Sequence, residues 1–395
     1  MVSIALLVII YISFINLGLP DSLLGAAWPS MYGFLEVPLH YAGYISMIMA
    51  VGRILSSLIC EKIVRRLGTG TVITVSFFLL SAALLGFSFS SSFFIICLWS
   101  IPLCLGAGFI DVTLNNYVAL NYKAKHMSWL HCFWGIGASI GPIIISYYLF
   151  NKNSWSMGYR AIGIIQCCFT VILIISFSLW EKNKSAAGIE EKKPVNVKYS
   201  ELFRTAGIIH ILVVFFCYVS IQISIVLWGS SFLVQEKNIS PETAARWISL
   251  FYIGLTAGRF ISGFLTMQFN NRQMVRIGHG LIALGVIALV VPLGNIFLMS
   301  GFFILGLGCA PIYPCLLHET PKNFGSEKSQ AFMGIQMACA FTGALIVPPL
   351  FGGFTSFTGF MIYPVFIGIF LSVNIVMFEI FNRKVDKANT RNERT

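Results

Sequence analysis

Twelve apolar stretches, each long enough to cross a lipid bilayer, constrain the fold of this chain more than any other feature of its sequence. A helix needs roughly 20 apolar residues to cross a hydrocarbon core of about 30 Å. The chain is 57% hydrophobic and 10% charged, whereas soluble domains carry about 25% charged residues. The sequence therefore predicts an all-α integral membrane protein. The expected spans are residues 3–28, 41–61, 70–88, 93–118, 128–150, 158–180, 205–234, 243–267, 274–293, 295–317, 329–352 and 357–381.

The positions of the basic residues predict the orientation of the chain in the membrane. The net charge is +11. If the N-terminus is cytoplasmic, 20 of the 26 Lys and Arg fall in inner loops and the tail, 4 fall outside, and 2 lie within helices. This asymmetry follows the positive-inside rule and predicts that both termini are cytoplasmic. We therefore interpret the basic charge as topology and not as a nucleic-acid site.

Other sequence features place the protein in a plasma membrane. No Lys or Arg precedes the first apolar stretch and eleven spans follow it, so we expect this segment to be retained rather than cleaved as a signal peptide. The outer loops contain no long segment suited to glycosylation, which fits a bacterial membrane. The ten cysteines lack metal-ligand spacing and are expected to pack as small apolar side chains. No metal, no organic cofactor and no obligate protein partner are expected.

Weak internal repeats divide the chain into two halves. Gly-Arg occurs at 52–53 and again at 258–259, an offset of 206 residues, and Pro142 and Pro348 have the same offset. We therefore predict two pseudo-symmetric bundles of six helices. The predicted boundaries are an N-terminal bundle at 1–181, a polar cytoplasmic linker at 182–204, a C-terminal bundle at 205–382 and a basic tail at 383–395.

Polar residues inside the spans of the first half are the primary site candidates. An ionised acid at the bilayer centre costs about 2.5–3.5 kcal/mol on insertion scales, so Asp111 should face protein or a watery cavity. Asn115 lies one helical turn after Asp111 and shares its face. His131 and Trp134 form a mixed face on the next helix. Two adjacent helices thus turn a polar seam toward each other.

The first and seventh spans carry further candidates. Asp21 follows Pro20, which is expected to weaken the helix and create a local hinge. Further along the first span, Trp28 shares the face of Asp21. In the seventh span Tyr218 and Gln222 lie on one face, and a buried Gln must find hydrogen-bond partners. Trp228 and Gln336 complete the expected solute-contact set, where Trp228 lines the cavity or simply packs. Gln336 and Asn374, the polar residues of the last two spans, are expected either to bind a ligand or to bond between helices.

A second group of residues is expected to act in gating or structure. Arg53 and Arg259 lie within helices and could form gating ion pairs or contact the solute. Two prolines of the tenth span, Pro311 and Pro314, interrupt an apolar run and suit a bending gate. The charged residues after the second span are expected to form a cytoplasmic gate: Glu61, Lys62, Arg65 and Arg66.

The motifs resemble the major facilitator superfamily, and within it the fucose and glucose/galactose permease-like sugar symporters. The matching segments are GLPDSLL (18–24), GFIDVTLNNY (108–117), HCFWGIG (131–137) and YVSIQ (218–222). Two six-helix halves with the solute near the midplane are typical of that superfamily. The resemblance implies proton-coupled sugar transport through acids that correspond to Asp21 and Asp111, and sugar contact at His131 and Trp134. The chain departs from the pattern at Gln222, where the branch has Glu.

We formulated a coupling hypothesis from these residues. Burial disfavours the charged form of a carboxyl group, so Asp111 could exchange protons near neutral pH, with His131 as a possible relay partner. Solute hydroxyls would bond Asn115, His131 and Gln222 while tryptophans stack on the sugar. In the alternative hypothesis, Asp111 stays ionised by pairing with Arg53.

The sequence also bears on other functions. The sequence contains no GxxxxGK[ST] nucleotide-binding motif. The GxSxG pattern at 137–141 lies in an apolar helix, where it predicts helix packing rather than hydrolase activity. An enzyme is therefore not expected. The main alternative is a proton-driven efflux antiporter, which Gly141-Pro142 resembles. A sensor or scaffold without transport is disfavoured by the short tail after Phe381.

Overall fold

The helices of the protein confirm the predicted number of membrane spans. The computed structural model describes residues 4–38, 41–152, 154–177, 179–180, 199–239, 241–292 and 294–392. Within these residues 12 helices are long and apolar enough to cross a membrane. The predicted linker lies outside the described residues as far as residue 198, and its last part contains the short helix α9 (Tyr199–Phe203).

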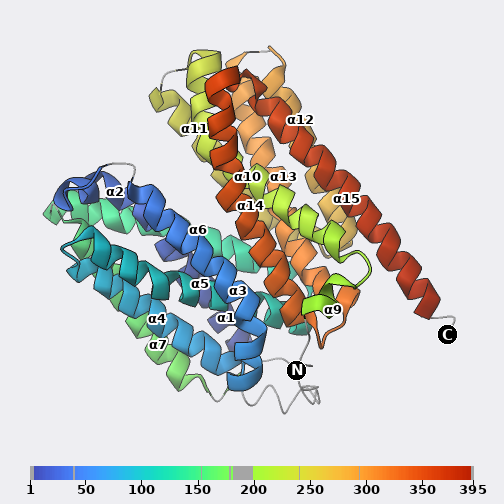
Figure 1. The fold of residues 1–395 in the computed structure, drawn as a ribbon, viewed down its shortest axis with the longest axis horizontal. Helices are drawn as coiled ribbons and strands as arrows, with labels where there is room; N and C mark the ends of the chain where they lie inside the picture. The colour runs from blue at the N-terminus through green and yellow to red at the C-terminus, as the bar shows by residue number, and fades with distance from the viewer. Residues whose placement is uncertain are drawn as a thin grey trace. The chain divides into compact units, whose positions relative to one another are not determined.

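The helices follow one another along the chain with short connections (Figure 1). The first half contains α1 (Ile4–Asp21), α2 (Leu23–Phe34), α3 (Ala42–Leu67), α4 (Thr69–Phe89), α5 (Phe93–Asn121), α6 (Ala124–Lys152) and α7 (Trp155–Ile175). After α9 follow α10 (Ile208–Lys237), α11 (Pro241–Leu265), α12 (Asn271–Val290), α13 (Asn295–Phe324), α14 (Ser329–Thr358), the 3-10 helix η2 (Phe360–Ile362) and α15 (Tyr363–Asn392).

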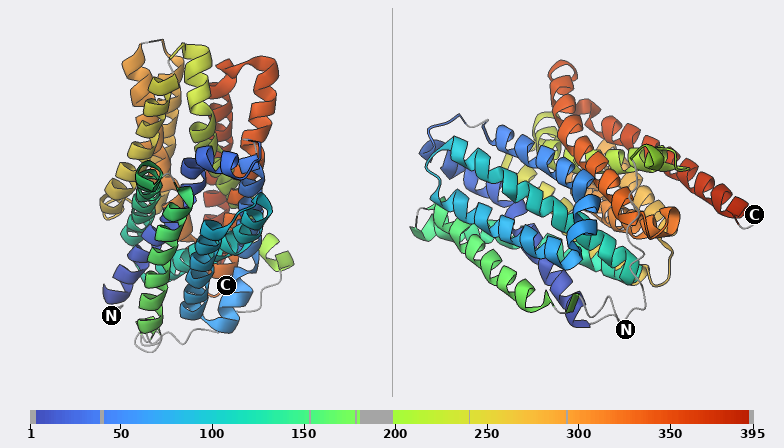
Figure 2. Two further views of the ribbon diagram at one scale, coloured as in Figure 1. Left: turned by 90° about the vertical axis from the view of Figure 1, so that its left-hand side faces the viewer. Right: turned by 60° about the horizontal axis from the view of Figure 1, so that its bottom comes forward.

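The helices form two compact units. Unit 1 consists of Met1–Asn121, Trp129–Asn196 and Glu327–Gly334, and unit 2 consists of Tyr122–Ser128, Val197–Ser326 and Ile335–Thr395. In unit 1, α5 packs against α3 and α4, and α4 also packs against α7. In unit 2, α13 packs against α11 and α12, and α15 packs against α10 and α12. Figure 2 shows the long helices of each unit running side by side.

Helices α13, α14 and α15 continue past their predicted ends, and α14 reaches Thr358 rather than residue 352. Helix α13 was expected to end near residue 317 but continues to Phe324, with Pro311, Pro314 and Pro321 inside it. Each proline removes one backbone hydrogen bond, a loss that membrane helices tolerate when neighbouring groups compensate for it. Helix α15 continues to Asn392, so most of the predicted basic tail is helical.

The first span is divided where Pro20 predicts a hinge. Helix α1 ends at Asp21 and α2 begins at Leu23. Between them the Ser22 hydroxyl donates a hydrogen bond of 2.7 Å to the carbonyl oxygen of Ala138 on α6. The break therefore lies at Ser22, and α6 stabilises it.

Glycines allow α1 and α6 to lie in backbone contact. A Cβ at Gly18 would lie 2.9 Å from the backbone nitrogen of Ala138, and a Cβ at Gly137 would lie 2.8 Å from the carbonyl carbon of Ile15. Any side chain at either position would therefore force the helices apart. This close contact confirms the prediction that the Gly137–Gly141 pattern serves helix packing.

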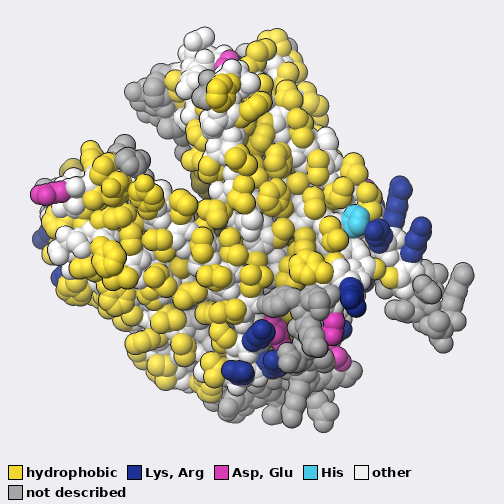
Figure 3. Space-filling view, viewed as in Figure 1, with side chains coloured by type: hydrophobic (Ala, Val, Ile, Leu, Met, Phe, Trp, Pro, Cys, Tyr) yellow, Lys and Arg dark blue, Asp and Glu magenta, His cyan; other side chains and the backbone are white. Residues whose placement is uncertain are grey.

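The surface of the protein matches a lipid environment. Hydrophobic side chains cover most of the visible face in Figure 3, including exposed Ile and Phe on the helices of each unit. In unit 2, Lys and Arg gather where α15 ends (Figure 3). An apolar belt with charges restricted to the helix ends is the surface that a bilayer requires.

Candidate functional site

Unit 1 contains a buried charged cluster around Asp21. One carboxylate oxygen of Asp21, at the end of α1, forms an ion pair with the guanidinium of Arg53 on α3. The other oxygen accepts a hydrogen bond of 2.8 Å from the indole nitrogen of Trp134 on α6. The Asp21 and Arg53 side chains are only 13% and 21% exposed. Three helices thus meet at one carboxylate.

A second cluster of unit 1 lies around Asp111. The amide nitrogen of Asn115 donates hydrogen bonds of 2.7 Å to Asp111 Oδ1 and 2.8 Å to its backbone oxygen. The Asn115 carbonyl oxygen lies 3.0 Å from His131 Nε2. A chain of hydrogen-bonding groups therefore leads from the carboxylate on α5 to the imidazole on α6. This arrangement confirms the predicted polar seam between these two helices.

Small residues bring the helices of the two clusters together. A Cβ at Gly108 on α5 would lie 3.1 Å from the Cβ of Ser56 and 3.4 Å from the Cα of Arg53, both on α3. A Cβ at Gly52 would likewise press on Cys104 of α5. Because the α3 and α5 backbones approach so closely, Arg53 also interacts electrostatically with Asp111.

The pairing of Arg53 includes an acid that the alternative hypothesis did not name. Arg53 forms an ion pair with Asp21, and it also interacts with the charge of Asp111. Whether Asp111 stays ionised through Arg53 stays a prediction. Arg53 therefore interacts with two acids. Because an uncompensated charge in a low dielectric costs free energy, a change in the charge of either acid affects the stability of the cluster.

The aromatic site candidates of unit 1 differ in burial and contacts. His131 is 6% exposed and meets the ring of Phe14 edge-on at 5.5 Å between ring centroids. Trp28 on α2 is 5% exposed. Trp134 is half-buried, and its indole nitrogen is bound to Asp21.

The candidates of unit 2 lie mainly within contacts between helices. The Tyr218 hydroxyl donates a 2.8 Å hydrogen bond to the carbonyl oxygen of Cys309, and the Trp228 indole donates one of 2.9 Å to the carbonyl oxygen of Pro348. Gln336 is fully buried beside Thr320. Gln222 is half-buried on α10. Any role of these residues in solute contact stays a prediction.

The predicted gating residues occupy helix ends and the interior of helices. Glu61 and Arg65 form an ion pair of 3.4 Å one turn apart at the end of α3, where Lys62 and Arg66 also lie. Arg259 is 4% exposed in α11. Pro311 and Pro314 lie in the interior of α13 and are buried. These positions fit structural roles, and gating stays a prediction.

His279 is a buried polar residue that the sequence analysis did not identify. His279 on α12 is 4% exposed, and its Nε2 lies 2.8 Å from the carbonyl oxygen of Asn374 on α15. The Asn374 amide in turn donates to the backbone oxygen of Val214 on α10. The sequence signal was a histidine inside an apolar segment. Asn374 therefore bonds between helices, one of the two roles expected for it.

Among the described residues no group of three or more His, Cys, Asp and Glu is placed to hold a metal.

The fold and the buried charges define a multi-pass membrane protein of the transporter type, and the sequence profile identifies its family. The profile of the Major Facilitator Superfamily matches residues 10–291 and 211–395. The chain therefore belongs to the Major Facilitator Superfamily. Its family and fold are those of transporters and not of enzymes.

Similar proteins with known names include sugar transporters. The glucose/mannose transporter GlcP of Bacillus subtilis is 21% identical, with 85% of this chain and 84% of GlcP covered. The structure of the proton:xylose symporter XylE superposes with a TM-score of 0.79 at 12% identity, covering 96% of this chain and 95% of XylE. The E. coli fucose:proton symporter FucP superposes with a TM-score of 0.74 at 16% identity, covering 97% and 99%. At these identities the likeness to the two structures establishes the fold.

Proposed function

We propose that this transporter carries a small polar solute, a sugar, by proton-coupled symport with alternating access. The observation that carries the proposal is the pair of half-buried acids in unit 1, of which Asp21 forms an ion pair with Arg53 and Asp111 interacts with the charge of the same Arg53. GlcP, XylE and FucP are all described as sugar transporters, and this supports a sugar as the solute of this chain. We further propose that the protein lies in the plasma membrane with both termini cytoplasmic, on the basis of its basic inner loops.

The charge of the cluster supports coupling to a proton. Asp21 and Asp111 together carry two negative charges when ionised, while Arg53 supplies one positive charge. With His131 neutral, the cluster has a net charge of −1, and uptake of one proton makes it neutral. Since a net charge inside a membrane protein is costly, the protonated and ionised clusters favour different surroundings. That difference is what a coupled transporter needs in order to link protonation to conformation.

The hydrogen-bonding groups of the cluster support a polyhydroxylated solute. Asp111 is half-buried, and Asn115 and His131 supply amide and imidazole groups beside it. Such groups can both donate to and accept from sugar hydroxyls. The Trp134 ring, fixed in orientation by its bond to Asp21, offers an aromatic face of the kind that packs against apolar sugar surfaces.

Proton movement in proteoliposomes tests this proposal. The purified protein is reconstituted with a pH-sensitive dye inside, and hexoses, deoxyhexoses, pentoses and disaccharides are added singly. We expect acidification of the lumen with one class of sugar. The variant Glu379→Gln is the control for replacing an acid of the cluster. Glu379 pairs with Arg276 on unit 2 and is not part of the cluster. Acidification should persist in that control.

Two other outcomes would refute the proposal. Proton movement with amphipathic cations or drugs, and none with any sugar, would favour the efflux antiporter that the Gly141-Pro142 pair resembles. Sugar uptake without proton movement would support a sugar as the solute but would exclude coupling to protons.

A further inference from the structure

Two prolines, Pro20 on α1 and Pro142 on α6, remove backbone hydrogen bonds near Asp21. Proline has no backbone N–H, so inside a helix it leaves the carbonyl oxygen four residues earlier without its usual donor. Pro20 affects the oxygen of Asn16 in this way, and Pro142 affects that of Ala138. An unpaired backbone oxygen inside a membrane protein costs free energy, so each of these two oxygens needs another donor.

The donor for the Asn16 oxygen is a glutamine of α7. Gln166 Nε2 donates a hydrogen bond of 2.6 Å to that oxygen. Gln166 is fully buried, and among the residues that the structure describes its own Oε1 has no hydrogen-bond partner. A leucine would fill the same space without burying an unpaired oxygen, so packing alone does not explain a glutamine here. The bond to Asn16 does explain it.

The donor for the Ala138 oxygen is Ser22, which lies at the break between α1 and α2. A serine directly before a helix ordinarily caps it by accepting a hydrogen bond from the first turn. Ser22 precedes α2 but makes no such side-chain cap. Its hydroxyl instead donates a hydrogen bond of 2.7 Å to Ala138 on α6. The hydroxyl is therefore used where Pro142 has removed a donor.

The two substitute bonds hold the backbone on both sides of Asp21. Asn16 lies in the turn of α1 before the break and is held by α7, while Ser22 follows Asp21 directly and is held by α6. The Asp21 carboxylate contacts Arg53 on α3 and Trp134 on α6. Since hydrogen-bond lengths vary by only about 0.5 Å, the position of this backbone determines whether both contacts form.

We propose that Gln166 and Ser22 are positioning residues of the charged cluster, which fix the backbone at Asp21 by supplying the hydrogen bonds that Pro20 and Pro142 remove. Both side chains bond backbone oxygens, so they act on the carboxylate indirectly. Because the two bonds come from outside α1, a shift of α6 or α7 moves Asp21 relative to its partners. The role in coupling rests on the proposed function, whereas the bonds themselves are tested without transport.

Denaturant titration of the purified full-length protein tests each bond by combining a side-chain variant with the proline that it serves. Gln166→Leu should raise the equilibrium constant for unfolding about 3- to 20-fold, the range measured for hydrogen bonds between membrane helices. In Pro20→Ala the new backbone N–H can bond Asn16, so most of the effect of Gln166→Leu should disappear. Pro142→Ala is the control proline variant, and it should leave the effect of Gln166→Leu in place.

Ser22→Ala gives the reciprocal test and covers the case in which Gln166→Leu does not fold. It removes only one hydroxyl group, and its loss of stability should be restored by Pro142→Ala but not by Pro20→Ala. The proposal is overturned if neither proline variant reduces the loss, or if both reduce it equally.

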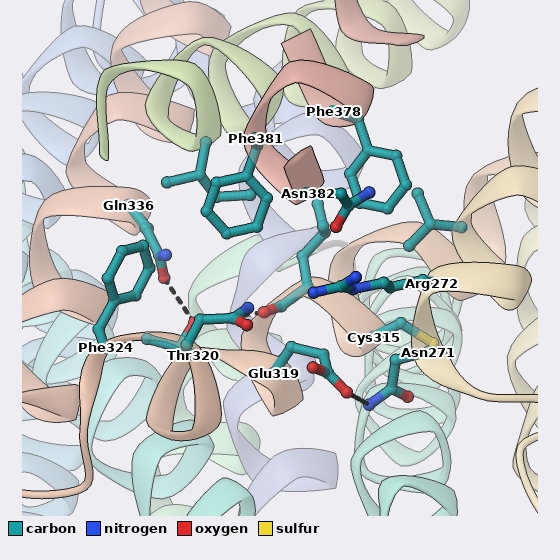
Figure 4. Close-up of a pocket in the computed structure, with 14 residues that line it drawn as sticks. Asn271, Arg272, Cys315, Glu319, Thr320, Phe324, Gln336, Phe378, Phe381 and Asn382 are labelled. Atoms are coloured by element: carbon teal, nitrogen blue, oxygen red, sulfur yellow. Dashed lines mark hydrogen bonds between the residues drawn. The ribbon is translucent and has the colours of Figure 1, made fainter. Parts of the chain in front are cut away.

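A second cycle tests whether Gln166 positions Asp21 or only stabilises α1. Trp134→Phe removes the indole bond to Asp21, so Gln166→Leu should cost less stability in that background than in the wild type. The matched control is Gln336→Leu, because Gln336 is an equally buried glutamine that bonds Thr320 in unit 2 (Figure 4). The effect of Gln336→Leu should be the same with and without Trp134→Phe. Additive effects for both glutamines would overturn the positioning role.

Transport measurements separate this inference from the proposed function. Sugar accumulation driven by a pH gradient should fall in Gln166→Leu and return when Pro20→Ala is added. A wild-type protein that moves no proton with any sugar would refute the proposed function. The two stability cycles would still decide whether Gln166 and Ser22 hold the backbone at Asp21.

Discussion

The close contact between α1 and α6 makes Gly137 a sensitive test of how the site is built. In Gly137→Ala the new methyl carbon would lie 2.8 Å from the Ile15 carbonyl carbon. Ordinary van der Waals contact begins at 3.4 Å, so the helices must separate by at least about 0.6 Å. Since Trp134 on α6 donates to Asp21 on α1 at 2.8 Å, the same movement would stretch that bond beyond the ordinary range of about 2.7–3.2 Å.

The loss in the free energy of unfolding of Gly137→Ala is estimated from two contributions. Forcing an extra methyl group into a packed interface costs about 1–3 kcal/mol. Weakening one hydrogen bond between membrane helices adds about 0.6 kcal/mol on average. We therefore expect Gly137→Ala to lower the free energy of unfolding by roughly 2–4 kcal/mol and to reduce sugar uptake. Gly18→Ala should act in the same direction, because its methyl carbon would lie 2.9 Å from the Ala138 nitrogen.

Gly25→Ala is the matched control for these variants. Gly25 lies in α2, and a Cβ there meets nothing within 4 Å. Because alanine favours helix by up to about 1 kcal/mol over glycine, this variant should be neutral or slightly more stable. Stability is measured by denaturant titration of the purified protein, and uptake in proteoliposomes. Equal stability and uptake in Gly137→Ala and Gly25→Ala would refute the argument that the glycine contact positions Trp134.

Three further predictions concern the clusters of unit 1. Trp134→Phe keeps an aromatic ring but removes the hydrogen bond to Asp21. The half-saturating sugar concentration should therefore rise about 3- to 20-fold, equivalent to about 0.6–1.7 kcal/mol. An unchanged half-saturating concentration in uptake assays would contradict this. Arg53→Met leaves the Asp21 charge uncompensated and should destabilise the protein by about 3–5 kcal/mol, and denaturant titration should show part of that loss restored by adding Asp21→Asn. His131→Gln keeps a hydrogen-bonding group beside Asn115 and should retain sugar uptake in proteoliposomes; if uptake falls as far as in His131→Leu, the imidazole itself is required.

The sequence predicted the helices well because the bilayer imposes one length and one composition on every span. The errors lay at helix ends. The span with Pro311 and Pro314 was expected to end near residue 317, yet helix α13 continues through Pro321 to Phe324. The rules for proline in soluble helices do not apply where neighbouring helices compensate for the lost backbone bonds.

The candidate site was predicted in its residues but only partly in its pairing. Asp111, Asn115 and His131 could be connected because helical spacing places the first two on one face and the next helix lies adjacent. The partner of Arg53 could not be determined, since two acids on other helices were equally available. Trp134 was assigned to the sugar because an indole ring offers an apolar face, whereas its N–H also bonds Asp21. Contacts between helices far apart in sequence have no local signal.

The surroundings of Gln336 in unit 2 show a different limit. Gln336 was identified as a notable polar residue of its span, but its hydrogen-bond partner Thr320 lies on another helix. Only the distances show that the Thr320 hydroxyl lies within hydrogen-bond reach of both Gln336 Oε1 and the carbonyl oxygen of Leu316. Sequence can therefore indicate which polar residues are buried, while the structure shows which of their atoms lack partners.

The central claim, that Asp111 carries the coupling proton, is tested most directly by Asp111→Asn in proteoliposomes. Asparagine keeps the size of the side chain and its capacity to hydrogen-bond Asn115, but it cannot exchange a proton. Two rates are measured on the same vesicles: sugar counterflow without a gradient, and sugar accumulation driven by an imposed pH gradient. We predict that counterflow persists and that accumulation is lost. Accumulation at the wild-type level in Asp111→Asn would contradict the claim.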